Sequence, residues 1–129
     1  MRCEILLIGN ELLIGKIQDT NGKWIINKLL PLGVEISRIT IIKDDLNEIG
    51  STIREILGRK PRYVFTSGGL GPTYDDMTLE GIAKGLRPPL SLVKNENAYQ
   101  MVLERYKRIY PGVPLEKLMK PSREKMTIL

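Results

Sequence analysis

The sequence predicts an α/β protein with a mostly parallel sheet, and three features of its 129 residues support that class. Segments of strand length alternate with segments of helical periodicity, in the order strand, helix, strand, helix, strand, helix. The first apolar run is unbroken, which is typical of a strand buried on both faces. Glycines and polar clusters follow the strands, at the sheet edge where parallel strands end and ligands bind. We therefore expect a doubly wound sheet whose loops form one site.

The first strand and the first helix open the chain. Residues 3–9 form the buried strand, which stops at Gly9. Asp19 or Thr20 can cap the helix that follows, and apolar residues recur at helical spacing until a glycine ends the run. Trp24 belongs to this apolar stripe, so we expect it in the core rather than against a ligand.

Two further strands and three further helices follow. β-Branched residues predict a second strand over residues 34–42, and Asp45, with a glutamate three residues later, predicts the capped start of the next helix. A third strand covers residues 63–66 and leads directly into a glycine-rich turn. The remaining helices are expected over residues 77–86 and from a cap at Asn95.

Composition narrows the classes of function. The chain has no histidine, and its one cysteine, Cys3, cannot form a disulfide framework or a cysteine zinc site within one chain. We find no signal peptide and no apolar run of membrane length, so we expect a single soluble domain over residues 1–129 in the cytoplasm. All of the net charge of +5 lies in residues 87–129, which we interpret as a solvated helix face rather than a nucleic-acid surface.

A glycine-rich turn follows the third strand. Its three glycines allow positive φ angles and let backbone N–H groups approach an anion. The helix after the turn adds the partial positive charge of its first turn. We therefore expect a phosphate cradle, against the alternative that the glycines only make a tight strand-to-helix turn. The candidate ligand contacts here are Thr66, Ser67, Gly68, Gly69, Leu70, Gly71, Pro72 and Thr73.

Three carboxylates are expected at the same sheet edge. Asp75 and Asp76 follow the glycine-rich turn, and Asp44 ends the second strand. Carboxylates beside a phosphate repel it unless a cation lies between them. We therefore expect Asp44, Asp75 and Asp76 to be catalytic and to hold a divalent metal ion such as Mg²⁺. The alternative is that Asp76 caps the next helix and Asp75 faces solvent.

The loop after the first strand is the third cluster at this edge. It is long and mixes polar with apolar residues, so we expect it to fold over a ligand as one wall of the site. Asp19 and Thr20 can also serve simply as the cap of the following helix, so ligand contact and capping both stay open for these two residues. The candidate ligand contacts of this loop are Gly9, Asn10, Glu11, Asp19, Thr20 and Asn21.

The chain carries two long motifs, IGNELLIGKIQDTN at residues 8–21 and TSGGLGPTYDDMT at residues 66–78. Together they resemble the molybdopterin-binding (MoCF) domain as found at the N-terminus of CinA-type proteins. The resemblance implies a three-layer α/β/α sandwich with a ligand pocket at the glycine-rich turn, and it adds Gly15 and Thr78 to the candidate ligand contacts. Because the family pattern continues beyond residue 126, we expect a C-terminal truncation. Family relatives also imply a homo-oligomer, either a dimer or a trimer.

The resemblance leaves several functions open, all of which use a small phosphorylated ligand. In CinA-type proteins the domain is associated with metal-dependent ADP-ribose pyrophosphatase activity. In molybdenum-cofactor synthesis the domain binds molybdopterin, and one branch adenylylates it with magnesium ATP. A different class of function is a module that holds a pterin or nucleotide without reacting.

Overall fold

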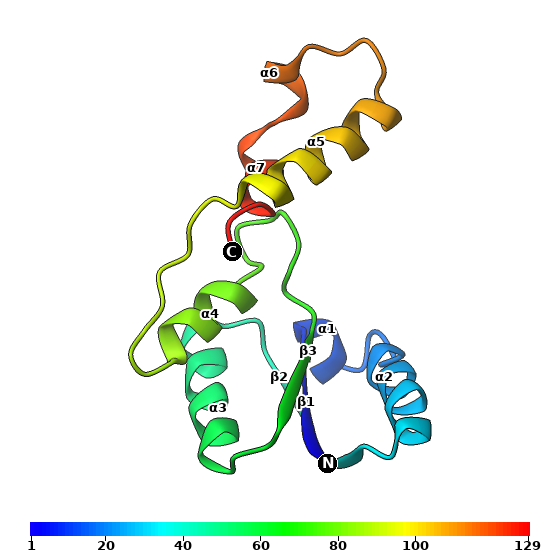
Figure 1. Cartoon of the computed structure of the whole chain (residues 1–129), viewed down its shortest axis with the longest axis vertical. Helices are drawn as coiled ribbons and strands as arrows, with labels where there is room; N and C mark the ends of the chain where they lie inside the picture. Colours follow the sequence, from blue (N-terminus) through cyan, green and yellow to red (C-terminus); the bar gives the residue numbers. More distant parts are fainter.

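The computed structural model describes residues 1–129, apart from the side chain of Ser122. Strands and helices alternate in the expected order through the first part of the chain, and helices alone follow (Figure 1). In chain order the elements are β1 (Arg2–Ile8), α1 (Asn10–Leu13), α2 (Asn21–Leu29), the 3₁₀ turn η1 (Leu30–Leu32), β2 (Glu35–Ile42), α3 (Leu46–Gly58), β3 (Tyr63–Ser67), α4 (Thr78–Gly85), α5 (Glu96–Ile109), α6 (Leu115–Leu118) and α7 (Pro121–Lys125).

β1 is the central strand of a three-stranded parallel sheet with the order β2-β1-β3. All of its residues after Arg2 are buried, as the unbroken apolar run predicts. The register aligns Ile8 with Ile42 of β2 and Leu7 with Ser67 of β3. The C-terminal ends of all three strands therefore meet at one edge, which is where the predicted loops converge.

Helices cover both faces of the sheet. Figure 1 shows α3 and α4 on one side and α1 and α2 on the other. α3 and α4 lie close together because glycines face each other, and a Cβ on Gly85 would lie 2.7 Å from the carbonyl oxygen of Gly50. This arrangement confirms the predicted three-layer α/β/α fold. The main core lies on the α3 side and is formed by Leu6, Ile8, Ile42, Ile49, Ile53 and Ile56.

The one acidic residue of β1 is paired inside the fold. Glu4 is 3% exposed, and its two carboxylate oxygens accept hydrogen bonds of 2.8 and 2.7 Å from Nε and Nη2 of Arg59. The Arg59 hydrogen bonds hold the pKa of Glu4 below its ordinary value, although burial works in the opposite direction. The pair joins β1 to the residue that ends α3.

The predicted helix starts are confirmed by their caps. Asp45 Oδ1 accepts hydrogen bonds from the backbone N–H groups of Asn47 and Glu48, at 3.0 and 2.9 Å. Asn95 Oδ1 accepts one from the N–H of Ala98 at 2.9 Å. Each cap satisfies N–H groups that have no partner within the helix.

Trp24 lies on the surface, which corrects the expectation that it belongs to the core. Its exposed fraction is 62%, and Lys28 Nζ lies 5.5 Å from the ring centroid. α2 approaches the sheet through Gly22, where a Cβ would lie 3.1 Å from Cδ1 of Leu7. Trp24 follows Gly22 by two positions, about 200° around the helix, so it points away from the sheet.

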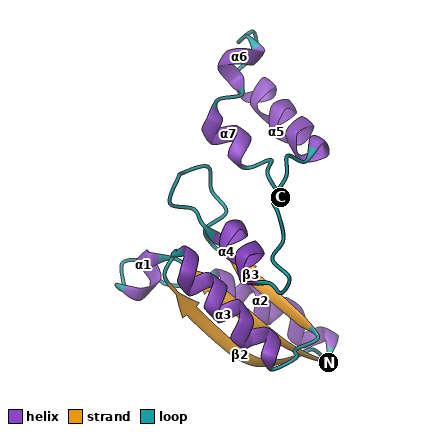
Figure 2. Cartoon of the chain, turned by 90° about the vertical axis from the view of Figure 1, so that its left-hand side faces the viewer, coloured by secondary structure: helices purple, strands orange, loops and turns teal.

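The last three helices form a second, smaller packed unit away from the sheet (Figure 1 and Figure 2). Its buried cluster consists of Leu103, Leu118 and Met119. Arg123 lies over the Tyr106 ring, 3.9 Å from its centroid, and closes the unit. No helix within the described residues is long and apolar enough to cross a membrane.

Candidate functional site

The glycine-rich turn has the backbone conformation that its sequence predicts. Gly68 and Gly69 have φ angles of +98° and +62°. A side chain on Gly68 would overlap the carbonyl oxygen of Ile8, and a Cβ on Gly69 would lie 2.6 Å from Asp44 Oδ2. The turn therefore needs glycine for close approach to its neighbours as well as for its φ angles.

Thr78 supports this turn from α4. It is completely buried, its hydroxyl donates to the Gly68 carbonyl oxygen at 2.8 Å, and its N–H donates to the Gly69 carbonyl oxygen at 3.2 Å. These bonds fix the path of the chain from β3 into α4. The predicted ligand contact Thr78 thus lies beneath the turn, bonded to two of its carbonyl oxygens.

A polar pocket of about 150 Å³ lies beside the turn at the C-terminal edge of the sheet. It brings together all three carboxylates predicted for this edge with residues from the loop after β1. We call it the polar pocket, and its lining is Ile8, Gly9, Asn10, Glu11, Asp44, Gly69, Thr73, Asp75 and Asp76.

Asp44 is held in place from two sides. Its N–H donates to Asn10 Oδ1 at 3.1 Å, and its Oδ1 accepts the N–H of Met77 at 2.9 Å. Burial raises the pKa of the Asp44 carboxyl, and the charges of Asp76 and Asp75 add to this effect, while the Met77 N–H acts in the opposite direction. Asp44 is thus a half-buried carboxyl whose ionised form is disfavoured by its surroundings.

Asp76 is held within its own loop. Its Oδ2 accepts the Thr73 N–H at 2.9 Å and also the Thr73 hydroxyl. Burial would raise the pKa of Asp76, but the hydrogen bonds from Thr73 and Gly71 and the charge of Lys125 outweigh it, and the pKa is lowered. Lys125 Nζ donates to the Thr73 carbonyl oxygen and, at 2.7 Å, to that of Asp76, so the end of the chain braces this loop.

The expected metal site is not formed by these carboxylates. Among the described residues, no group of three His, Cys, Asp or Glu side chains is arranged to hold a metal ion. Asp76 Oδ2 is bonded to Thr73, and Asp44 Oδ1 is bonded to the N–H of Met77, so neither aspartate offers both oxygens to a cation. The donor set therefore does not fit a bound divalent ion in this arrangement.

A second small pocket, of about 110 Å³, lies between the loop after β1 and the end of β3. Asn21 Nδ2 donates to Ser67 Oγ at 2.8 Å across it. Both oxygens of Asp19 lie 3.1 Å from the N–H of Gly22, so Asp19 caps α2 while it lines the pocket. Its lining also includes the predicted residues Glu11, Thr20 and Gly68.

Six predicted ligand contacts line neither of these two pockets, among them Thr78, described above, and Gly71, which lies in the glycine-rich turn. Gly15 has a φ of +69° and open space around its Cβ position, which is the signature of a turn. Thr66 lies inside β3, paired with Leu6 of β1. The other two are Pro72 and Leu70, and the latter is 51% exposed.

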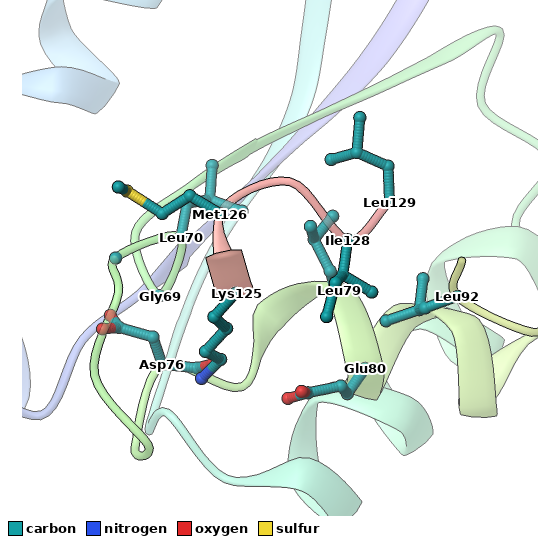
Figure 3. Close-up of a pocket in the computed structure, with 11 residues that line it drawn as sticks. Gly69, Leu70, Asp76, Leu79, Glu80, Leu92, Lys125, Met126, Ile128 and Leu129 are labelled. Atoms are coloured by element: carbon teal, nitrogen blue, oxygen red, sulfur yellow. The ribbon is translucent and has the colours of Figure 1, made fainter. Parts of the chain in front are cut away.

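An apolar cavity of about 320 Å³ adjoins the glycine-rich turn on its other side, and sequence reasoning did not find it (Figure 3). α4 and the last residues of the chain close it. Gly69, Leu70, Gly71 and Asp76 of its lining were predicted as site residues, whereas the aliphatic wall formed by α4 and the end of the chain was not. We call it the apolar cavity, and its lining is Gly69, Leu70, Gly71, Asp76, Leu79, Glu80, Leu92, Lys125, Met126, Ile128 and Leu129.

Comparison with known proteins extends this description. Residues 4–126 match the family model described as "Probable molybdopterin binding domain". The chain is 52% identical over 126 residues to a protein of Metallosphaera sedula, covering 98% of this chain and 44% of that relative. It is 44% identical over 126 residues to a protein of Sulfurisphaera tokodaii, covering 98% and 45%. The chain therefore spans less than half the length of these relatives.

Solved structures give the same picture. A CinA protein of unknown function from Thermoplasma acidophilum superposes with a TM-score of 0.84 and 35% identity, over 100% of this chain and 70% of that chain. The tungsten cofactor synthesizing protein MoaB from Pyrococcus furiosus has a TM-score of 0.59 and 23% identity, over 84% and 64%. The second similarity shows the fold alone.

Proposed function

The chain belongs to the molybdopterin-binding domain family, and from this premise we propose that it binds a phosphorylated pterin or nucleotide across the glycine-rich turn. One observation carries the proposal. Gly69 forms the wall between a polar pocket at the strand ends and a cavity with apolar lining. A ligand that carries hydroxyl or N–H donors and a ring can occupy both sides of this wall, with its phosphate over the turn.

The turn offers favourable charge to an anion. The positive φ angles of Gly68 and Gly69 leave their backbone unshielded by side chains, and α4, which starts at Thr78, directs the positive end of its dipole toward the turn. Lys125 brings an ammonium group to the same loop. A phosphate near these groups replaces water by backbone N–H donors and a cation.

The polar pocket itself suits hydrogen-bond donors of the ligand. Four carboxylates, those of Glu11, Asp44, Asp75 and Asp76, line it, and no basic residue does so within the described lining. A phosphate deep in this pocket would be repelled. Ribose hydroxyls or ring N–H groups would donate to these oxygens, so the phosphate belongs over the turn and not among the carboxylates.

Hydrolysis of ADP-ribose by a metal-dependent mechanism is the second candidate. The observation in its favour is that Asp44, Asp75 and Asp76 line one pocket. It requires Asp44 and Asp76 to leave their present partners, because the carboxylates as arranged do not fit an ion. Adenylylation of molybdopterin requires the same rearrangement of the aspartate side chains. Binding without reaction requires no rearrangement, and we therefore place it first.

A thermal-shift panel tests the proposal. We expect ADP-ribose, AMP, ATP or neopterin phosphate to raise the melting temperature in a dose-dependent manner, with the rise preserved in EDTA. A ligand at 100 times its Kd stabilises by about 2.7 kcal/mol. Chromatography of the same samples with Mg²⁺ or Mn²⁺ reports turnover, which would favour the hydrolase instead. Absence of any shift across the whole panel would contradict ligand binding at this site.

A further inference from the structure

The apolar cavity and the polar pocket are neighbours. Both are lined by Gly69 and Asp76, so they share one residue of the glycine-rich turn and one of the loop that follows it. Their characters differ, because one is lined by carboxylates and the other by aliphatic side chains. A ligand that crosses the turn meets polar groups on one side and apolar walls on the other.

The walls of the apolar cavity come from distant parts of the chain. Leu79 stands on α4, Leu92 on the connection to α5, and Ile128 and Leu129 at the end of the chain. Figure 3 shows these side chains gathered beside α4, with Lys125 reaching toward Asp76 on the other side. The volume of about 320 Å³ lies at the lower end of small-molecule sites, which span about 300–1,000 Å³.

One carboxylate of this cavity lacks a partner. Glu80 Oε2 is buried and has no hydrogen-bond donor within the described residues. Glu80 stands at the start of α4 and lines the cavity below Leu79 (Figure 3). A buried acceptor without a donor is unfavourable, and a donor supplied by a ligand would offset that cost.

We propose that the apolar cavity holds the planar heterocycle of the ligand, with Glu80 accepting a hydrogen bond from its exocyclic amino group. The inference rests on the proposed function and adds to it the side on which the ring binds. Aliphatic walls suit the faces of a flat ring, and a carboxylate suits an amino group at its edge.

The same chemistry argues against a phosphate in this cavity. Glu80 and Asp76 are both acidic, and Lys125, the one cation of the described lining, lies beside Asp76 and the turn (Figure 3). Pterins and adenine share the required features, namely a planar ring and an exocyclic amino group. Titration with a pterin and with an adenine nucleotide distinguishes which of the two rings binds.

Calorimetric titration of the complete chain with four probes tests the inference. The probes are AMP, purine riboside 5′-phosphate, which lacks the amino group, ribose 5-phosphate, which lacks the ring, and neopterin phosphate. We expect the tighter of AMP and neopterin phosphate to identify the source of the ring. A charged hydrogen bond is worth about tenfold or more in affinity, so Glu80→Met should weaken that ligand by about tenfold. Ribose 5-phosphate should bind Glu80→Met and the natural chain equally.

Two further variants provide a second test of the cavity and a matched control. Leu92→Trp fills the cavity from a connecting segment and should weaken the ring-bearing ligand by at least as much, while leaving ribose 5-phosphate unchanged. Glu55→Met removes an exposed carboxylate of α3 and should change neither. Thermal unfolding without ligand verifies that each variant is folded.

The outcomes separate the two proposals. If ring-bearing probes bind no tighter than ribose 5-phosphate, or if Glu80→Met and Leu92→Trp leave their affinity unchanged, the ring site is wrong while phosphate binding at the turn stands. If none of the four probes binds the natural chain, both proposals fall.

Discussion

The sheet body and the C-terminal helices differ in how many side chains they bury in their cores. The sheet body, residues 1–86, has a core of six fully or nearly buried aliphatic side chains between β1, β2 and α3. The C-terminal helices, residues 95–125, have three buried residues and rely on Arg123 stacked over tyrosine rings. The glycine-rich turn belongs to the first region, and the apolar cavity beside it is closed mainly by residues that flank the second, namely Leu92, Met126, Ile128 and Leu129.

Few bonds join the two regions. Lys125 donates to the carbonyl oxygens of Thr73 and Asp76, whereas the backbone bonds of Val93 with Leu129 and of Asn95 with Thr127 close the C-terminal part on itself. The glycine-rich turn is therefore held by the sheet body, whereas the apolar cavity depends on contacts that open at lower cost. If the proposed function holds, the comparison teaches that stability and ligand selectivity are located in different parts of this chain.

Truncating the cores should give the largest effect and should divide the two regions. Ile49 is fully buried in the sheet body, and Ile49→Ala should lower the free energy of unfolding by about 2–5 kcal/mol. Leu103→Ala, in the smaller cluster, should cost less because that cluster can collapse. Urea denaturation monitored by circular dichroism measures both, and equal losses would contradict the comparison.

Substitution by alanine in the glycine-rich turn should have the second-largest effect on stability. Gly69→Ala places a methyl group against Thr78 and Asp44 at a φ of +62°. Gly33→Ala is the matched control, since its φ is +71° and its Cβ would meet nothing within 4 Å. Both variants carry strain from the φ angle, so Gly69→Ala should exceed the control by about 1–3 kcal/mol from crowding. Equal melting temperatures would show that the turn has room for a side chain.

The buried ion pair should matter by a smaller amount and with a defined pH dependence. Arg59→Met leaves the Glu4 carboxylate buried without its partner and should cost about 1–3 kcal/mol at neutral pH. The folded-state pKa of Glu4 is lowered, so its stabilisation is present above the unfolded pKa and is lost as the pH falls through the folded pKa. The variant should therefore lose less stability than the natural chain on acidification, and parallel pH profiles would refute this assignment.

Asp44 should show the opposite pH dependence of stability. Its pKa is raised in the fold, so its favourable contribution is present below the unfolded pKa and is lost as the pH rises through the folded pKa. Asp44→Asn keeps an oxygen for the Met77 N–H and removes the charge. It should be at least as stable as the natural chain at neutral pH, by up to about 1 kcal/mol. A clear destabilisation at neutral pH, measured by urea denaturation, would mean that the charge is needed.

Lys125→Met should give the smallest change in stability. It removes two hydrogen bonds to exposed loop carbonyls, with a cost of about 1 kcal/mol or less. It should weaken phosphate-bearing ligands several-fold, because the loop loses both its brace and a cation. Lys107→Met on α5 is the matched control and should change neither property. Unaltered ligand affinity in Lys125→Met would show that the C-terminal helices do not contribute to ligand binding.

Local patterns were sufficient to predict most of the sheet body. The unbroken run before Gly9, the cap at Asp45 and the glycines after β3 each specify their structure within a few residues, and the fold follows from their order. The strand ends then bring Asp44 and Asp75 to one pocket without further information. These features depend on short-range chemistry, which a sequence displays directly.

Features that depend on long-range packing were missed. Trp24 lies on an apolar stripe, but the helix turns Gly22 toward the sheet, and no local signal distinguishes the two sides. Lys125 binds carbonyls 52 and 49 residues away, and Glu80 lines a cavity only because the end of the chain returns to α4. The divalent ion was expected from the acidic residues alone, whereas one oxygen each of Asp76 and Asp44 is already bonded to Thr73 and Met77.

Amide chemical-shift mapping tests the central claim most directly. The uniformly ¹⁵N-labelled chain is titrated in turn with AMP and neopterin phosphate, and every backbone amide is followed. The account predicts saturable shifts centred on Gly68, Gly69 and Gly71, with Gly33 and Gly112 unmoved as glycines remote from the site. Shifts confined to α5, or saturation that leaves the glycine-rich turn unchanged, would contradict it.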